Sequence, residues 1–196
     1  METTLSLVAF IIASVVTPGP NNLMVLASGA NWGLGRTLPH IFGIALGFPV
    51  MIVAAGLGVA AVFETVPWLY RVLHYVAFAY LCWLAWRIAT AARPGETAGI
   101  RRPLNFLQAA GFQWVNPKAW TLVISGMAVF VDPDGNKLMQ VIGIAALFAL
   151  VVLPNCVAWA AFGRGIAGFL SNDGRRRWFN IAMALLLVGS AVPALT

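Results

Sequence analysis

Charged residues are scarce in this sequence. They make up 9% of its 196 residues, whereas hydrophobic residues make up 61%. A soluble domain carries about 25% charged and about 45–50% apolar residues. One globular core of this size could not bury so much apolar surface, and a disordered chain would have far fewer apolar residues. The composition therefore excludes a water-soluble enzyme and a disordered chain, and it favours an all-α integral membrane protein.

Cysteine is also rare. The two cysteines, Cys82 and Cys156, lie far apart inside apolar runs, and the sequence has no Cys-x-x-Cys motif. A disulfide-rich secreted domain, a zinc site and a dithiol redox motif are therefore not indicated. We expect no metal and no other cofactor.

Motifs of hydrolysis and of nucleotide binding are missing as well. The sequence contains no His-Glu-x-x-His, no Gly-x-Ser-x-Gly and no P-loop. Intramembrane proteolysis, ester hydrolysis and ATP-driven transport therefore lack support, and we expect no catalytic residue. An ion gradient or the gradient of the substrate would supply the energy. No Asp or Glu falls in the middle of an apolar stretch, so no carboxylate can be named as a proton carrier.

Long apolar stretches are what the sequence has in abundance. A spanning helix needs about 20 mostly apolar residues. Six stretches qualify, at about 4–28, 39–63, 67–90, 106–131, 138–162 and 178–196. The first has no basic segment before it and no small-residue cleavage site after it, so we interpret it as a permanent helix rather than a signal peptide. The sequence thus predicts six membrane-spanning helices in a lipid bilayer.

The net charge of +6 comes from basic residues in alternate gaps between these stretches. The first, third and fifth gaps contain Arg36, then Arg93, Arg101 and Arg102, then Arg164 and Arg175–Arg177, whereas the other gaps contain Glu64, and Asp132, Asp134 and Lys137. Short basic segments among apolar runs argue against a nucleic-acid partner. Because basic loops mark the cytoplasmic side, we expect both termini on the periplasmic side.

The two halves of the chain share a weak repeat. Pro20 is followed at a fixed distance by Ser28-Gly29, and 97 residues later Pro117 is followed in the same way by Ser125-Gly126. Gly43-Ile44-Ala45 returns 100 residues later as Gly143-Ile144-Ala145. We expect one transmembrane domain, 1–196, with repeat one at about 1–92 and repeat two at about 104–196. Three spans in each half would give the halves opposite orientations, as in many secondary transporters.

Prolines interrupt the first and fourth predicted spans near mid-membrane. The Pro18-Gly19-Pro20 segment should break the first helix outright, because proline lacks a backbone donor and clashes with the preceding turn. Asn116-Pro117 indicates a helix start, with Asn116 as N-cap and Pro117 at the first position. We therefore expect second half-helices at roughly 20–30 and 117–130. In an inverted repeat their N-termini would converge and attract an anion such as a carboxylate.

Polar residues flank both breaks, and Lys118 is the most informative of them. A lysine at the bilayer centre costs about 2.5–3.5 kcal/mol on insertion scales. Two interpretations stay open: its ammonium caps free carbonyls of the first half-helix, or it holds an anionic substrate group. The side-chain amides nearby both donate and accept hydrogen bonds, which suits a zwitterion; they belong to Asn21, Asn22, Gln113 and Asn116. The alternative for the breaks is that both prolines merely kink their helices.

Two further features concern helix contacts. Gly43 and Gly47 form a Gly-x-x-x-Gly pattern, which predicts a close helix contact. Pro154-Asn155 either lines a pathway or marks a packing kink in the fifth span.

These motifs resemble those of the LysE/RhtB amino-acid exporters, in order along almost the whole chain. The resemblance rests on Pro18-Gly19-Pro20-Asn21, on the stretch from Gly35-Arg36 through Gly43 to Gly47, on Ala79-Tyr80-Leu81, and on Gly111-Phe112 before Asn116-Pro117-Lys118-Ala119. It implies a six-helix inner-membrane protein that exports amino acids or their derivatives, driven by the proton motive force. The functional residues that it carries over are Pro18, Gly19, Pro20, Asn21, Asn116, Pro117 and Lys118. Ala79 and Ala85 stand where the family would favour glycine.

The expected partners are a small-molecule substrate, an amino acid or derivative, and the lipid bilayer; association into a homodimer stays open. Two other functions are weighed against export. A thiol-disulfide electron conduit has a similar architecture, but it needs reactive cysteines at the two breaks, where this sequence has Pro-Gly-Pro and Asn-Pro-Lys. A passive channel or a non-transporting membrane protein is the other alternative, and only transport against a gradient excludes it.

Overall fold

The protein is described here by a computed structural model that covers residues 2–91 and 102–190. Those residues form α-helices joined by short connections, and they contain no strand. The helices are α1 (Glu2–Val16), α2 (Pro20–Trp32), α3 (Leu34–Ala54), α4 (Ala60–Thr65), α5 (Pro67–Ala89), α6 (Phe106–Val115), α7 (Pro117–Phe130), α8 (Lys137–Ile166) and α9 (Asp173–Gly189). A π-helical turn, Ala55–Val59, joins α3 to α4, and a 3₁₀ turn, Phe169–Ser171, precedes α9. The all-α class is confirmed for this part of the chain.

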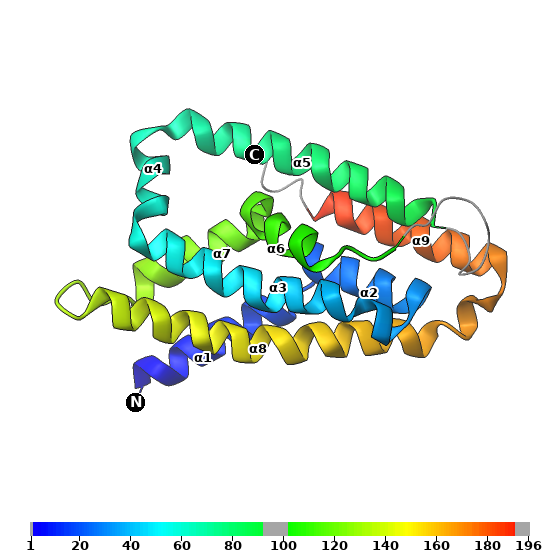
Figure 1. Ribbon diagram of the computed structural model, residues 1–196, viewed down its shortest axis with the longest axis horizontal. Helices are drawn as coiled ribbons and strands as arrows, with labels where there is room; N and C mark the ends of the chain where they lie inside the picture. Colours follow the sequence, from blue (N-terminus) through cyan, green and yellow to red (C-terminus); the bar gives the residue numbers. More distant parts are fainter. Residues whose placement is uncertain (1, 92–101, 191–196) are drawn as a thin grey trace.

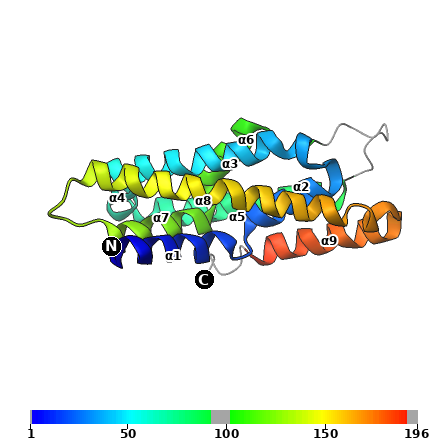
Figure 2. The same ribbon diagram turned by 90° about the horizontal axis from the view of Figure 1, so that it is seen from below.

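The long helices run roughly along one axis of the molecule (Figure 1). Helices α3 and α8 lie side by side in both views (Figures 1 and 2), and their contact is among the most extensive, with those of α2 on α8, α6 on α3 and α9 on α5. Phe48 and Phe148 meet edge to face at the α3–α8 contact, with ring centroids 5.1 Å apart. Both side chains are buried, so α3 and α8 form the centre of the core.

Glycines allow the closest helix contacts. A Cβ added to Gly47 would lie 2.6 Å from the Cα of Ala110, and one added to Gly43 would overlap the carbonyl oxygen of Phe106. The predicted close contact at Gly43 and Gly47 is therefore confirmed, and its partner is α6. On the other side of the core, Gly29 of α2 and Gly163 of α8 approach the backbone of the facing helix in the same way.

Both predicted helix breaks are present. Helix α1 ends at Val16 and α2 begins at Pro20, with a bend of 52° between them. Asn116 alone separates α6 from α7, which begins at Pro117. The predicted half-helices at 20–30 and 117–130 are thus confirmed, and α2 continues to Trp32. In Figure 1, α1 and α2 run along the long axis in the direction opposite to α6 and α7.

Within residues 2–91 and 102–190, fewer than six helices are long and apolar enough to cross a membrane. In the described residues three single helices are long and apolar enough to cross a membrane, at Leu34–Val59, Arg71–Ala89 and Lys137–Ile166, and the bent pair of α1 and α2 would be a fourth. The predicted span at 39–63 is kinked at Gly58, whose φ is +119°, a backbone angle that favours glycine. Helix α9 begins at Asp173, earlier than the predicted 178, and its first turn includes charged residues.

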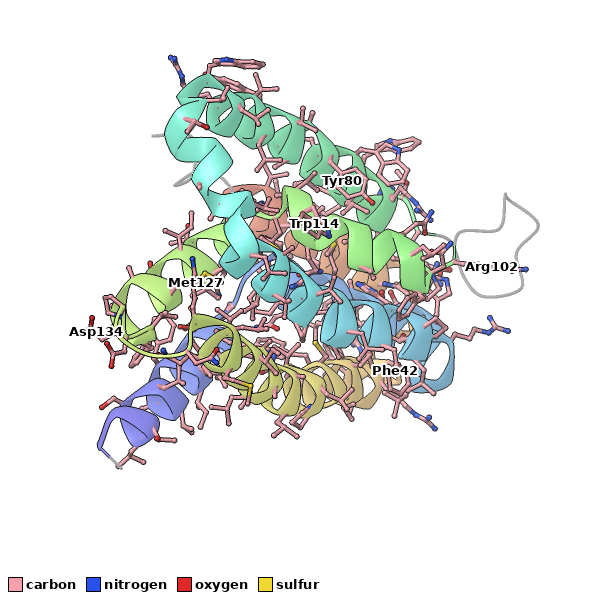
Figure 3. All side chains as sticks on the ribbon, turned by 60° about the vertical axis from the view of Figure 1, so that its left-hand side comes forward. Phe42, Tyr80, Arg102, Trp114, Met127 and Asp134 are labelled. Carbon is pink, nitrogen blue, oxygen red and sulfur yellow. The ribbon has the colours of Figure 1, made fainter. Side chains whose placement is uncertain are left out.

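Most of the described arginines lie at one end of the molecule, the basic end, and Asp132 and Asp134 lie at the other. The connections from α2 to α3 and from α8 to α9, and the start of α6, lie at one end, while those from α4 to α5 and from α7 to α8 lie at the other (Figure 1). Arg102 and Asp134 occupy the two sides accordingly in Figure 3. Arg93, Arg101 and the expected end of the last span, 191–196, lie outside the described residues.

Candidate functional site

The two helix breaks meet in space. The ammonium Nζ of Lys118, in the first turn of α7, donates a 2.7 Å hydrogen bond to the carbonyl oxygen of Thr17, at the end of α1. Gly19 makes room for this approach, because a Cβ there would lie 2.9 Å from Cδ of Lys118 and 3.1 Å from its Nζ. Residues about 100 positions apart in sequence therefore place the first turns of α2 and α7 next to each other.

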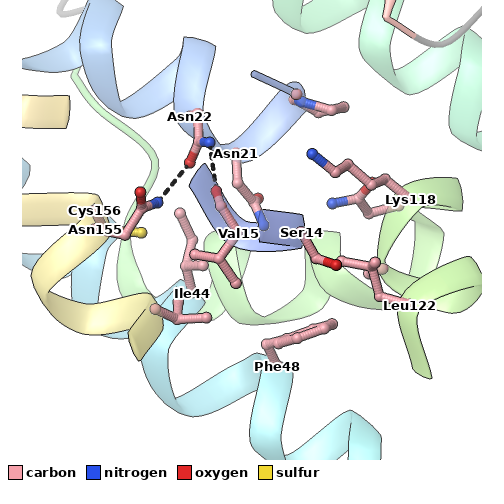
Figure 4. A pocket seen from close by; sticks show the side chains of 15 residues that line it. Ser14, Val15, Asn21, Asn22, Ile44, Phe48, Lys118, Leu122, Asn155 and Cys156 are labelled. Atoms are coloured by element: carbon pink, nitrogen blue, oxygen red, sulfur yellow. Dashed lines mark hydrogen bonds between the residues drawn. The ribbon is translucent and has the colours of Figure 1, made fainter. Parts of the chain in front are cut away.

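A pocket opens where the breaks meet (Figure 4). Its empty volume is about 440 Å³ with the open mouth included. Residues of α1, α2, α3, α7, α8 and the two breaks line it: Ser14, Val15, Gly19, Pro20, Asn21, Asn22, Ile44, Phe48, Asn116, Lys118, Ala119, Leu122, Val152, Asn155 and Cys156. Lys118 is the one charged residue among these described lining residues, so the pocket is cationic on one side and apolar or amide-lined elsewhere.

A reciprocal amide pair joins the two broken helices. Asn21 Nδ2 donates to Gln113 Oε1 at 2.8 Å, and Gln113 Nε2 donates to Asn21 Oδ1 at 3.2 Å. Gln113 Nε2 also donates to the carbonyl oxygen of Ala109, one turn earlier in α6. Because Gln113 is fully buried and its amide is bonded on both sides, it positions Asn21 and does not itself line the pocket.

A second amide, that of Asn22, compensates for the break in the first span. Its Nδ2 donates to the carbonyl oxygens of Val15 (2.8 Å) and Thr17 (3.1 Å), which α1 leaves without helical partners. Its Oδ1 accepts a 2.9 Å hydrogen bond from Nδ2 of Asn155 in α8 (Figure 4). Asn22 therefore uses both ends of its amide on protein groups.

Asn116 differs from its predicted role. It stands at the N-cap of α7 with extended backbone angles, as predicted, but its side chain makes no capping hydrogen bond. The N-cap prediction is thus correct for the position and wrong for the side-chain bond. Asn116 is 2% exposed and its Oδ1 has no hydrogen-bond partner. A buried acceptor without a partner costs about 1–3 kcal/mol, and this one belongs to a residue that lines the pocket.

Lys118 has the capping role that was one of the two interpretations from the sequence. Its bond to Thr17 places one ammonium N–H on a carbonyl released by the break, which is the capping role. An ammonium has three N–H donors, and Lys118 is only partly buried beside the pocket. Two donors therefore remain for a second acceptor.

Most of the predicted site residues are brought together. Gly19, Pro20, Asn21, Asn22, Asn116 and Lys118 line the pocket, whereas Pro18, Gln113 and Pro117 lie next to it in sequence or contact and do not line it. The sequence did not indicate Ile44, Phe48 or Leu122, because apolar residues of a membrane helix look alike in sequence. It did not indicate Ser14 either, which is a single hydroxyl residue within an apolar run. Asn155 was detectable as a polar residue beside Pro154; it lines the pocket, and its Nδ2 donates to Oδ1 of Asn22.

Both cysteines are free, Cys82 in α5 and Cys156 in α8. Cys156 is buried and lines the pocket, whereas Cys82 does not.

Comparison with known proteins assigns the chain to a family. The model of the LysE type translocators matches residues 12–196. A cysteine/O-acetylserine efflux protein of Salmonella typhimurium (strain LT2) is 35% identical over 185 residues, which cover 93% of this chain and 92% of the relative. A protein of the same description from Escherichia coli (strain K12) is 33% identical over 186 residues, with the same coverage of both chains. No solved structure matches the chain. With its apolar helices and this similarity along nearly its whole length, the chain belongs to the family of LysE type translocators, and it is a membrane transporter rather than an enzyme.

Proposed function

We propose that this protein exports a small zwitterionic amino acid, of the class of cysteine and O-acetylserine, across the inner membrane and that the proton motive force drives export. The relatives' efflux descriptions support the substrate class. The observation that carries the proposal for the site is the pocket between the two helix breaks, where a partly buried ammonium and an unpartnered amide oxygen lie together.

The carboxylate of the substrate binds on the Lys118 side of this pocket. Lys118 has two N–H donors beyond the one on Thr17. The first turns of α2 and α7 add free backbone N–H groups and the positive ends of two helix dipoles. Together these groups replace the water that a carboxylate loses on entering the pocket, and without them burying that charge would be strongly unfavourable.

The ammonium of the substrate donates to Oδ1 of Asn116, which has no partner in the protein. Asn21 is held in place by Gln113, so its remaining lone pair and N–H face a fixed site. Ile44, Phe48, Leu122 and Val152 line the same pocket and accommodate a short side chain. A zwitterion with a small side chain therefore satisfies both polar groups and the apolar wall.

The six-span arrangement with inverted repeats fits the same proposal. The helix pairs α1–α2 and α6–α7 run in opposite directions and meet at their breaks, which is what two inverted three-helix halves would produce. The repeats would cover about 1–92 and 104–196, with six membrane crossings in all. Alternate opening of the central pocket to either side would follow from rocking one half against the other.

Proton coupling is the energetic part of the proposal. The sequence has no nucleotide-binding motif, which leaves gradients as the energy source. Export from cells that overproduce the protein should therefore continue against a substrate gradient and stop when a protonophore collapses the proton gradient. Export that only equilibrates the substrate would instead identify a passive channel.

The binding mode is tested by replacing Lys118 with methionine, which keeps the apolar stem and removes the charge. Lys118→Met should lower export of the amino acid about tenfold or more, because a hydrogen bond to a charged group contributes about 1.5–3 kcal/mol. Export of the corresponding amino-acid amide, which has no carboxylate, should change far less. The measurement is export of acid and amide by overproducing cells, normalised to the amount of protein in the membrane.

The other lysine supplies a matched control. Lys137 is exposed at the start of α8 and does not line the pocket, so Lys137→Met should leave acid and amide export unchanged. If Lys118→Met reduced the export of acid and amide equally, Lys118 would act only as a cap on Thr17. If it exported the acid as well as the wild type does, the carboxylate site would have to lie elsewhere.

A further inference from the structure

A second pocket lies between α2, α3, α5 and the segment before α6. It is lined by Met24, Ser28 and Trp32 of α2, His40 of α3, Leu84, Arg87 and Ile88 of α5, and Arg102, Pro103 and Leu104. Its two arginines lie at the basic end of the molecule, and none of the described lining residues is acidic. The central pocket, by contrast, has a single ammonium.

His40, which lines this second pocket, has a buried polar atom without a partner. The residue is 1% exposed, and its Nδ1 lies 3.3 Å from the hydroxyl oxygen of Ser28. Its Nε2 is buried without a hydrogen-bond partner. When the Ser28 hydroxyl donates to Nδ1, the imidazole carries its proton on Nε2 and presents a donor. Buried polar groups are normally paired, so this atom indicates a missing ligand.

Most guanidinium N–H groups of Arg87 and Arg102 make no hydrogen bond to the described residues. Arg87 uses Nη2 to donate to the carbonyl oxygen of Arg102 at 3.1 Å, and its guanidinium carbon lies 5.0 Å from the centroid of the Trp83 ring. These contacts hold the guanidinium group in place, and each guanidinium has five N–H donors. Beyond that bond, the described residues offer the two guanidinium groups no further acceptor, and the imidazole adds an N–H in the tautomer with its proton on Nε2. Arginine forks match the geometry of an oxyanion.

Helix α2 connects the two pockets. Asn21 and Asn22 of its first turn line the central pocket, and Met24 and Ser28 line the second. At a rise of about 1.5 Å per residue, Ser28 lies roughly 10 Å along the helix from Asn21. The second pocket thus lies on the same helix, between the central pocket and the basic end.

We propose that Arg87, Arg102 and His40 form a second substrate site, which holds the carboxylate of the amino acid before it moves along α2 to the central pocket. The proposal rests on the proposed function for the identity of the ligand. An oxyanion at this place could also be a lipid phosphate; the continuity with the central pocket through α2 favours the substrate.

Binding of radiolabelled O-acetyl-L-serine to the purified full-length protein in detergent tests this proposal. The wild type should bind two molecules. Lys118→Met should lose the central site and retain one, whereas the double variant Arg87→Gln with Arg102→Gln should weaken the second site at least about tenfold and retain the Lys118-dependent one. That retained binding also shows that the double variant is folded. Arg36→Gln, which removes an exposed arginine of α3 that does not line the pocket, should bind like the wild type.

Three outcomes separate this proposal from the proposed function, and a fourth overturns both. Wild-type binding by the double arginine variant would overturn the second site and leave the central one intact. Loss of binding in that variant together with unchanged binding in Lys118→Met would support the second site and contradict the central one. Binding of phosphatidylglycerol, but not of O-acetylserine, at the arginine-dependent site would make it a lipid site and overturn the proposal. No O-acetylserine binding by the wild type would overturn both.

Discussion

At the scale of single residues, the polar side chains around the breaks mainly replace lost backbone partners. In a bilayer the carbonyls that a break releases cannot turn to water, so the protein must satisfy them. Asn22 does this for Val15 and Thr17, and Lys118 shares the carbonyl of Thr17. Against this background Asn116 is exceptional, because its buried Oδ1 has no partner.

Asn116→Ala is therefore expected to separate stability from export. Its side chain makes no capping bond, so the loss of about 1 kcal/mol that follows the removal of a true cap should not occur. The thermal unfolding midpoint in detergent should stay equal to that of the wild type or rise slightly, whereas export should fall severalfold. A lowered midpoint would mean that Asn116 caps α7 after all.

The cysteines allow a test of the rival electron conduit. That chemistry needs two cooperating thiols, but Cys82 and Cys156 are free and only Cys156 lines the central pocket. Cys82→Ala combined with Cys156→Ala should leave export nearly intact, because neither thiol has an assigned role in binding. The measurement is export per amount of membrane-inserted protein. Complete loss of export in a stably inserted double variant would favour the redox function.

At the scale of helices, the sequence predicted the features that have a local cause and did not predict those that depend on long-range packing. The breaks at Pro20 and Pro117 follow from proline chemistry, and the contact of Gly43 with α6 follows from the spacing of small residues, so both could be predicted. The bond from Lys118 to Thr17 joins segments about 100 residues apart in sequence. The sequence could therefore give capping only as one of two possible roles of Lys118. The missing cap of Asn116 and the pairing of Asn155 with Asn22 depend on the packing of α7 and α8, which no local pattern encodes.

The contact between α2 and α8 gives a prediction at this scale. A Cβ at Gly29 would overlap the carbonyl of Ala160, and one at Gly163 would overlap that of Leu26, so backbone would have to move. Overpacking of this kind costs about 1–3 kcal/mol. Gly29→Ala and Gly163→Ala should each lower the unfolding midpoint in detergent.

Gly143 is the matched control, because it also lies in α8 and an added Cβ there would meet nothing within 4 Å. Gly143→Ala should keep the wild-type midpoint or raise it slightly, since alanine favours helix. Equal midpoints for all three variants would show that α2 and α8 are farther apart than described here.

At the scale of the whole molecule, the uneven distribution of arginine predicts the orientation in the membrane. Most of the described arginines gather where α2 joins α3, at the end of α5, where α6 begins and where α8 joins α9, whereas Arg71 lies near the start of α5. Asp132 and Asp134 mark the opposite end. Because the positive-inside rule places short basic loops in the cytoplasm, the end with Arg102 should be cytoplasmic and the end with Asp134 periplasmic. The second pocket would then face the compartment from which an exporter takes its substrate.

Single cysteines introduced into the variant without native cysteines test this orientation. Asp134 is exposed in the turn between α7 and α8, and Gly168 is exposed between α8 and α9, so both substitutions are expected to be tolerated. Asp134→Cys should react with a membrane-impermeant maleimide in intact spheroplasts, and Gly168→Cys should react only after the membrane is permeabilised. A reporter fused after Thr196 should agree with them: alkaline phosphatase should be active there, and a fluorophore that matures only in the cytoplasm should be silent. The reversed labelling pattern would invert the topology, and it would move the pocket of Arg87 and Arg102 to the exit side, where it could only release substrate rather than collect it.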